Sequence, residues 1–503
     1  MAAIEGAVVN SENQTSPYHT VVADGMLKFR RCGDFFQTRD EFRSLRMDHV
    51  DIEAARNEHE PFQAVILATD GDLKDVTITV GEFRSDDGSV LDPHAIVPHL
   101  VHYMFDPVSE SWYPDALLPF TPFDLPAGES QAIWFDVTIG VNTDPGTYHG
   151  SVTVRPPGLS EQVVTVGLTV FPFALPDSAP TRTAFGIGTE QLSQWHGVPT
   201  GTPEFEALYD RYYWFLVDRL ISPQHLPVPL DPNRMAPYLN DPRVSGVLMP
   251  YSDDATVLGQ TIQMYKDHGW MDKAYLYPVD EPYGKAQYDR LTDAAGKIHT
   301  IDSSAKVICP YYRNPEFAED ELAIKHLTGS VDIWCALTSY YHPEELRERI
   351  AAGDNVWWYT CCVPIEPYPN FQIQMPPIDH RILFWQMHHF DIEGFLYWSV
   401  NTWTDDPYKE LPAMWLESRQ RDSISDGHLL YPGPDGPVSS IRLELIREGL
   451  EDLQYLKLLE DMAGPGEAKR FVQRLVGGTT FYERDPRELM KVRSQLARRI
   501  CEG

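Results

Sequence analysis

The stretch AYLYPVDEP at Ala274–Pro282 has the pattern of a short buried strand that ends in two acids and a proline. A helical pattern follows, because the apolar residues Tyr288, Leu291, Ala295 and Ile298 recur at 3-4-3 spacing. A strand followed directly by a helix is the repeating unit of parallel α/β folds. The stretch therefore predicts one βα unit, and the question is how often the unit recurs.

The same alternation extends in both directions from this unit, starting near residue 181. The candidate strands are Thr183–Ile187, Ser222–Val228, Ser245–Met249, Ala274–Val279, Lys306–Tyr311, Asp332–Leu337, Val356–Thr360 and Gly394–Val400. The other helical patterns are Phe205, Leu208, Tyr212 and Phe215, and then Leu443, Ile446, Leu450 and Leu453. Eight repeats over roughly 250–280 residues are typical of a (β/α)8 TIM-like barrel. We expect this barrel at residues 181–465, with a doubly wound open sheet as the alternative.

The first part of the chain has a β pattern instead. Short runs rich in Val, Ile, Thr and aromatic residues occur at Pro61–Thr69, Val76–Phe83, Ala132–Ile139, Thr147–Arg155 and Val163–Phe173. Turn signals such as Asp144-Pro145-Gly146 separate these runs. The pattern predicts an antiparallel β-sandwich at residues 41–175, after an N-terminal extension at 1–40. The proline-bearing residues 171–180 are predicted to be a linker, and 466–503 a C-terminal helical segment.

Composition narrows the classes of function. The 503 residues carry a formal charge of −33, which disfavours binding to nucleic acid and to anionic membranes. Six cysteines without a CxxC pair predict neither a disulfide scaffold nor a zinc site, and no metal or cofactor is expected. The N-terminus lacks a signal-peptide pattern and no apolar run is long enough to span a membrane, so a cytoplasmic protein is expected. Homo-oligomerisation is left open.

Chemically useful residues gather at the predicted strand ends, where barrels place their active sites. Two neighbouring carboxylates, Asp280 and Glu281, end the fourth strand. Aromatic and amide side chains end or follow other strands, and the candidate substrate-binding residues among them are Tyr340, Tyr359, Trp398, Asn401 and Trp403. Aromatic faces stack on sugar rings and amides bind sugar hydroxyls. The pattern therefore predicts a glycan site, although an Asp-Glu-Pro triplet by itself often only starts a loop or caps a helix.

Adjacent acids favour a particular mechanism. Two-carboxylate glycosidases hold their acids roughly 5–9.5 Å apart, usually on different strands. Neighbouring acids suit substrate-assisted catalysis, in which the 2-acetamido oxygen of the sugar is the nucleophile. Asp280 then orients and stabilises the acetamido N–H, and Glu281 delivers a proton to the leaving oxygen.

Four other features are interpreted as structural. His388-His389 lies in a helical stretch, and Cys361-Cys362 is interpreted as a pair of buried thiols. Asp405-Asp406 is predicted to lie in a solvated loop. The charges of RLELIREGLED at Arg442–Asp452 are predicted to form the outer face of the last helix.

Several motifs resemble a known family. They are ARNEHEPFQAVI (Ala55–Ile66), WYPDALLP (Trp112–Pro119), YPVDEP (Tyr277–Pro282), WWYTCCVPIEPYPN (Trp357–Asn370), GFLYWSVNTW (Gly394–Trp403) and DGHLLYPGPDGPVSSIRLELIREGLED (Asp426–Asp452). Over about residues 50–460 the chain resembles the family of domain of unknown function 4091, which is similar to glycoside hydrolase family 123.

The resemblance implies a β-sandwich followed by a (β/α)8 barrel and an exo-acting β-N-acetylgalactosaminidase that retains configuration by substrate assistance. It places the catalytic pair on Asp280 and Glu281, and the acetamido pocket on Tyr340, Tyr359, Trp398 and Asn401. The expected partner is a glycan substrate. Two alternatives stay open: a glycosidase for another sugar with a second acid from Glu366, Asp405 or another strand end, and a non-catalytic carbohydrate-binding protein.

Overall fold

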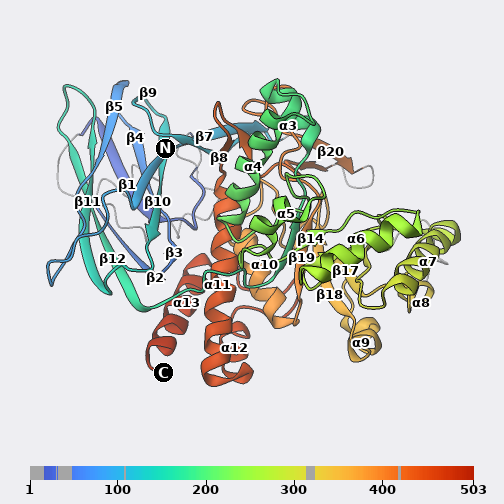
Figure 1. The fold of residues 1–503 in the computed structure, drawn as a ribbon. Coiled ribbons are helices and arrows are strands. Elements are labelled where there is room, and N and C mark those ends of the chain that lie inside the picture. Colours follow the sequence, from blue (N-terminus) through green and yellow to red (C-terminus); the bar gives the residue numbers. More distant parts are fainter. Residues whose placement is uncertain (1–15, 30, 32–47, 107–108, 313–322, 417–420) are drawn as a thin grey trace.

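The computed structural model describes residues 16–29, 31, 48–106, 109–312, 323–416 and 421–503. A part made of β-strands lies at one side and an α/β part at the other, with the C-terminal helices between them (Figure 1). The order of the two parts confirms the prediction of a β domain followed by an α/β domain.

Two sheets form the β part. The first has the order β1(Tyr18–Asp24), β4(Phe62–Ala68), β10(Ser130–Ile139), β7(Ile96–Asp106), β8(Ser111–Pro119), with β3(Glu58–His59) also on β10. The second has the order β2(His49–Arg56), β12(Gln162–Ala174), β11(Gly146–Arg155), β5(Leu73–Val80), β9(Phe123–Leu125), with β6(Arg84–Ser85) also on β11. All pairs are antiparallel except β2 with β12. Both sheets contribute to one apolar core, in which the ring of Phe62 stacks on that of Phe135 at 4.5 Å.

The sheets also reach into the stretches predicted as extension and linker. β1 pairs with β4 from Tyr18 to Asp24, so the first sheet begins within the stretch predicted as an extension. β12 continues to Ala174, so the first residues of the predicted linker belong to a strand. Phe171 and Leu175 are buried there, and their burial outweighs the turn tendency of the neighbouring prolines.

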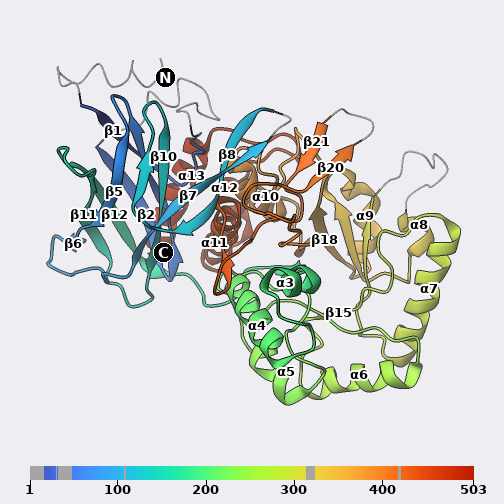
Figure 2. The same cartoon turned by 90° about the horizontal axis from the view of Figure 1, so that it is seen from above.

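A parallel sheet forms the centre of the α/β part. Its order is β13(Arg182–Phe185), β19(Gly394–Tyr397), β18(Asn355–Thr360), β17(Ile333–Leu337), β16(Ile308–Tyr311), and β14(Val247–Leu248) pairs separately with β15(Ala274–Tyr275). Figure 2 shows helices around the outside of these strands. They are α3(Thr189–His196), α4(Pro203–Val217), α5(Pro232–Leu239), α6(Ala255–Asp267), α7(Gly284–Ile301), α8(Ala323–Leu327), α9(Pro343–Ala351) and α10(Pro377–His389). The helical patterns predicted near residues 205–215 and 288–298 lie in α4 and α7.

The second predicted strand, Ser222–Val228, is wrong as a strand. Only an isolated parallel bridge joins Pro223 to Phe185 there. Proline has no N–H to donate, so Pro223 and Pro227 cannot contribute to a regular ladder. Gln224 nevertheless accepts a hydrogen bond from Leu248 N at 2.8 Å, and a second bridge joins Leu276 to Val307.

The long helix α11(Ile441–Ala463) corrects another expectation. Its charged residues were expected on an outer face, but all of those within Arg442–Asp452 are buried. The helix lies against β8 of the sandwich, α10, α12(Pro465–Val472) and α13(Pro486–Cys501), so it has no solvated face over this stretch. Most of these charges are paired instead. The pairs include Arg442 with Asp115, Asp452 with Arg381 and Arg493, and Arg447 with Asp136.

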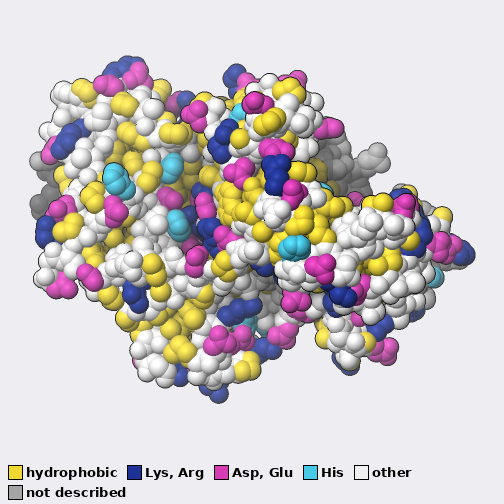
Figure 3. Space-filling model, in the orientation of Figure 1, with side chains coloured by type: hydrophobic (Ala, Val, Ile, Leu, Met, Phe, Trp, Pro, Cys, Tyr) yellow, Lys and Arg dark blue, Asp and Glu magenta, His cyan; other side chains and the backbone are white. Residues whose placement is uncertain are grey.

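Two small antiparallel pairs lie between β19 and α11: β20(Ala413–Leu416) with β21(Arg421–Ile424), and β22(Tyr431–Pro432) with β23(Pro437–Val438). Acidic and basic side chains are interspersed over the face drawn in Figure 3. Within the described ranges, no helix has the length and apolar character needed to cross a membrane.

Candidate active site

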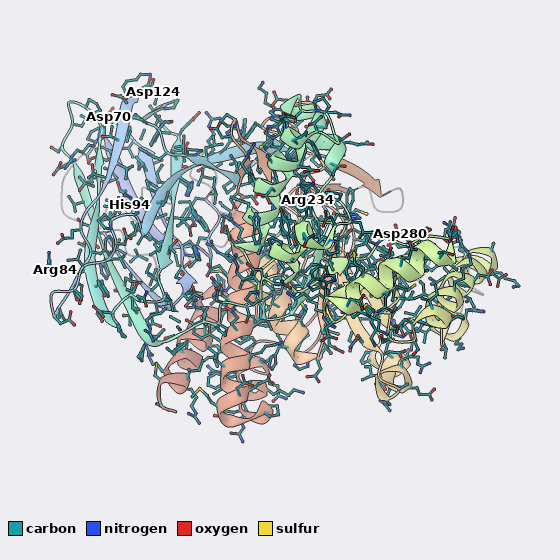
Figure 4. All side chains as sticks on the ribbon, in the orientation of Figure 1. Asp70, Arg84, His94, Asp124, Arg234 and Asp280 are labelled. Atoms are coloured by element: carbon teal, nitrogen blue, oxygen red, sulfur yellow. The ribbon has the colours of Figure 1, made fainter. Side chains whose placement is uncertain are left out.

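A cavity of about 630 Å³ opens at the carboxyl ends of the parallel strands. Its lining comes from the segment after β15 and from the ends of β18 and β19 with the residues that follow them. Single residues come from β16, from the loop before β22 and from the segment after the Pro223 bridge. The lining residues are Gln224, Tyr277, Asp280, Glu281, Pro310, Tyr359, Cys361, Cys362, Leu396, Trp398 and Asp426. Figure 4 shows Asp280 on the α/β part, far from the labelled sandwich residues. Parallel strands bring their carboxyl ends to one edge, which is why segments so distant in sequence meet here.

Each acid of the predicted pair has a tyrosine partner. Tyr277 donates a hydrogen bond from its hydroxyl to Oδ1 of Asp280 at 2.5 Å, and Tyr359 donates one to Oε1 of Glu281. Burial holds the pKa of both phenols well above the usual value, so each stays protonated and acts as a donor. The structure therefore brings Asp280, Glu281 and Tyr359 into one cavity.

The backbone at Glu281 is left-handed, with a φ of 37°. Consecutive side chains of an extended segment point to opposite sides, so two neighbouring acids do not ordinarily face the same cavity. The left-handed turn changes this direction and lets both acids line the cavity. A non-glycine residue in this conformation costs on the order of 1–2 kcal/mol, and such strain recurs at functional sites.

The environment of Glu281 favours its protonated form. Burial raises the pKa of this carboxyl, and the neighbouring charge of Asp280 raises it further, while the hydrogen bond from Tyr359 lowers it. Asp280 is exposed at the mouth. The two acids thus differ in environment, which is how a pair of carboxyls divides acid and charge-stabilising roles.

Sequence reasoning missed a third carboxylate, Asp426. Trp398 donates its indole N–H to Oδ2 at 3.0 Å, and Tyr397 donates its hydroxyl to Oδ1 at 3.1 Å. Burial raises the pKa of Asp426 to about 6. In the sequence Asp426-Gly427 has only the signature of a turn, although it begins one of the family-like motifs.

The remaining predicted substrate-binding residues lie in different settings. Trp398 lines the cavity and is 45% exposed. Asn401 is fully buried and bonds through its amide to the backbone of Gly188. Trp403 donates to Leu430 O at 2.7 Å, and Tyr340 ends the short 3-10 turn Thr338–Tyr340. Tyr340, Asn401 and Trp403 are not among the cavity-lining residues.

Other side chains also differ from their interpretation. Cys361 and Cys362 are partly exposed and line the cavity, because the chain turns away from β18 at this point; the interpretation as buried thiols is wrong. Glu366 and Asp405 are exposed and do not line the cavity. Across the described ranges, no three His, Cys, Asp or Glu residues form a cluster suited to a metal ion.

Comparisons with known families match two parts of the chain. The model described as Glycoside hydrolase 123, catalytic domain, matches residues 253–459, and the model described as Glycoside hydrolase 123 N-terminal domain matches residues 33–156. The first match contains Asp280, Glu281 and most of the cavity lining, and the second contains most of the sandwich.

Among solved structures, a family 123 glycoside hydrolase from Clostridium perfringens, described in connection with glycolipid glycan hydrolysis, is similar with a TM-score of 0.72. The similarity covers 97% of this chain and 98% of that chain at 15% identity, which shows a shared fold. A family 5 xyloglucanase from Bacteroides ovatus has a TM-score of 0.30 and 9% identity, over 80% of this chain and 98% of that one. The latter score is too low to carry an argument. No curated protein matches the sequence.

Proposed function

The chain belongs to glycoside hydrolase family 123, and on this premise we propose that it releases terminal β-linked N-acetylgalactosamine from glycans with retention of configuration. One observation carries the proposal: Asp280 and Glu281 are neighbours that line the same cavity, Asp280 is exposed, and burial of Glu281 favours its protonated form. A purely carbohydrate-binding cavity has no need for this division between two adjacent acids.

The proposed reaction begins with attack by the acetamido oxygen of the substrate on its own anomeric carbon. The bond to the leaving oxygen breaks as Glu281 gives that oxygen a proton, and a bicyclic oxazolinium ion forms. Asp280 stabilises the positive charge that develops on the acetamido N–H, and Tyr277 fixes the carboxylate in place. Glu281, now ionised, then takes a proton from a water molecule. This water attacks the anomeric carbon from the face that the leaving group left, which gives net retention.

Asp426 is the residue that an alternative mechanism would use. A glycosidase for another sugar needs a second carboxylate in the cavity, and Asp426 supplies one where Glu366 and Asp405 do not. Two donors already occupy its oxygens, and its raised pKa of about 6 makes it a weaker nucleophile near that pH. These observations favour a role for Asp426 in holding Trp398 beside the substrate, with Tyr340, Asn401 and Trp403 as outer supports of the site.

We further propose that the α/β part closes as a (β/α)8 barrel over residues 181–465. The support comes from contacts that connect the five-stranded sheet with the β14–β15 pair. The Phe185–Pro223 bridge and the bond from Leu248 N to Gln224 O join them at one side, and the Leu276–Val307 bridge joins them at the other.

A panel of chromogenic aryl glycosides tests the proposal. We expect hydrolysis of the aryl β-N-acetylgalactosaminide and not of the aryl β-galactoside, because the latter lacks the acetamido nucleophile. The configuration of the first-formed product, followed by NMR, should be β. Equal turnover of both substrates, or an α first product, contradicts the proposal.

A further inference from the structure

A pair of thiols lies in the wall of the candidate active site. Cys361 and Cys362 follow β18, both line the cavity, and their sulfur atoms are 3.9 Å apart. The other cysteines that the structure describes are placed differently: Cys309 and Cys335 are fully buried, and Cys501 is exposed at the end of α13. A small ligand in the cavity can therefore reach this pair of sulfurs together.

The backbone that carries the pair is fixed from behind. The amide of Asn370 donates to Cys361 O at 2.9 Å, and the amide of Gln372 donates to Cys362 O at 2.9 Å. Both amide side chains are completely buried. Cys361 N also donates to Val363 O at 2.8 Å. The two carbonyls are thus held, and only the side chains remain free to adjust toward a ligand.

This geometry suits a bridging atom better than a direct sulfur–sulfur bond. The Cα atoms of two disulfide-bonded cysteines are usually about 4.4–6.8 Å apart. The Cα atoms of neighbouring residues are only about 3.8 Å apart, which is too close for an unstrained disulfide. A metal ion that prefers four protein ligands is also poorly matched, because no third ligand of the required kind joins the pair within the described chain. A trivalent arsenical with one organic substituent needs two thiols and no more.

We propose that Cys361 and Cys362 form a bidentate site for monosubstituted trivalent arsenicals, and that a bound arsenical blocks the cavity to glycan. The second half of the proposal rests on the proposed function, and the first half does not. The reaction is balanced without an oxidant. Two arsenic–oxygen bonds break and two arsenic–sulfur bonds form, each hydroxyl leaves as water with one thiol proton, and arsenic stays trivalent.

The two thiols are not equivalent. The two sulfur atoms share a hydrogen bond, which lowers the pKa of Cys362 and raises that of Cys361. The thiolate is the nucleophile in thiol chemistry, so Cys362 attacks arsenic first and Cys361 closes the ring.

Phenylarsine oxide is the probe for the test. All samples carry Cys32→Ala and Cys501→Ala in the full chain, which we call the background chain. These changes remove the exposed Cys501 and Cys32, which lies outside the described residues, so that neither can react. We expect one equivalent bound by intact-protein mass spectrometry, and fragmentation should place it on the peptide that contains residues 361 and 362. Dimercaptopropanol should remove it, and mercaptoethanol at the same thiol concentration should not. Cys361→Ser and Cys362→Ser should each lose the stable adduct.

An adduct on another peptide, or removal by the monothiol as easily as by the dithiol, overturns the dithiol site. The peptide is assigned in the background chain, so this test remains valid even if a serine variant fails to fold. Hydrolysis of the aryl β-N-acetylgalactosaminide is measured on the same samples. We expect activity to fall in proportion to occupancy and to return with dimercaptopropanol. Full activity at one bound equivalent overturns the blocking step. A chain that hydrolyses nothing before treatment, and that binds one equivalent at residues 361–362 after treatment, contradicts the proposed function but supports the dithiol site.

Discussion

Tyr359, near the end of β18, donates a hydrogen bond from its hydroxyl to Oε1 of Glu281, and both residues line the cavity. The two residues are separated by 78 positions in the chain, and only the alignment of parallel strand ends brings them together. The bond opposes burial: burial raises the pKa of Glu281 and the tyrosine lowers it. Tyr359 therefore adjusts the pH at which Glu281 keeps its proton.

Tyr359→Phe should move the activity of the enzyme to higher pH. Removal of the hydrogen bond takes away an interaction that lowers the pKa of Glu281, so the acid stays protonated further into the alkaline range. We expect the alkaline limb of the kcat/KM profile to shift upward. Tyr277→Phe is the matched control, because Tyr277 contacts Asp280 instead. An unchanged or downward-shifted limb in Tyr359→Phe contradicts this role.

Glu281→Gln should remove most activity, because general acid catalysis contributes about 10²–10⁴-fold. A dinitrophenyl glycoside needs little protonation of its leaving oxygen, so its loss should be much smaller than that of an alkyl glycoside. The ratio of the two kcat values in variant and wild type measures this difference. Equal losses on both substrates assign Glu281 a role other than proton donor.

The place of Asp280 and Glu281 in the cavity was predictable from sequence because it depends on local features. A strand pattern that ends in Asp280-Glu281 places two acids at the edge of the sheet where the carboxyl ends of the strands meet. No contact with a distant part of the chain is needed to predict this position. The same argument located Tyr359, one residue before the end of β18, and Trp398, which directly follows β19. Their place in the cavity lining follows from the parallel sheet.

The residues whose environment was predicted wrongly are those that contact distant parts of the chain. The local sequence pattern does not specify these contacts. Arg442 has the spacing of a solvated helix face, yet it is buried because the sandwich packs against α11. Asp426 has the sequence signature of an ordinary turn aspartate, and its place in the cavity wall is fixed by a hydrogen bond from Trp398, which is 28 residues distant. A strand was predicted at Ser222–Val228 as part of the strand–helix alternation, but its prolines leave only one bridge.

Asp115→Ala should destabilise the fold strongly. Asp115 accepts two hydrogen bonds from Arg442, at 2.9 and 2.7 Å, and both side chains are completely buried between β8 and α11. Removal of one partner leaves an uncompensated charge, which costs about 3–5 kcal/mol. Urea denaturation measures the change. Asp124→Ala, which breaks an exposed pair with Lys74, is the control and should leave the midpoint nearly unchanged. Similar small shifts in both variants contradict the buried-pair argument.

Asp426→Asn should change how stability depends on pH. The pKa of Asp426 is raised from 3.8 to about 6 in the folded chain, so folding favours the protonated carboxyl. The wild type should therefore lose stability relative to the variant as pH rises from about 4 to about 7, by up to about 3 kcal/mol. Denaturation of both chains at several pH values gives this difference. A constant difference across the range means that Asp426 is not held in a protonation-sensitive environment.

Asp280→Asn separates the catalytic interpretation from a structural one. An asparagine preserves the size of the side chain and can still satisfy a turn or cap a helix, so a purely structural Asp280 predicts nearly full activity in the variant. In the substrate-assisted mechanism the amide cannot stabilise the positive charge that develops on the acetamido nitrogen. Loss of such electrostatic stabilisation typically costs about 10²–10³-fold in kcat. Substrate affinity should change much less, because that charge is absent from the bound ground state. The decisive measurement is kcat for the aryl β-N-acetylgalactosaminide, with an unchanged melting curve to show that the variant is folded, and wild-type turnover in a folded Asp280→Asn chain rules out the proposed role of Asp280.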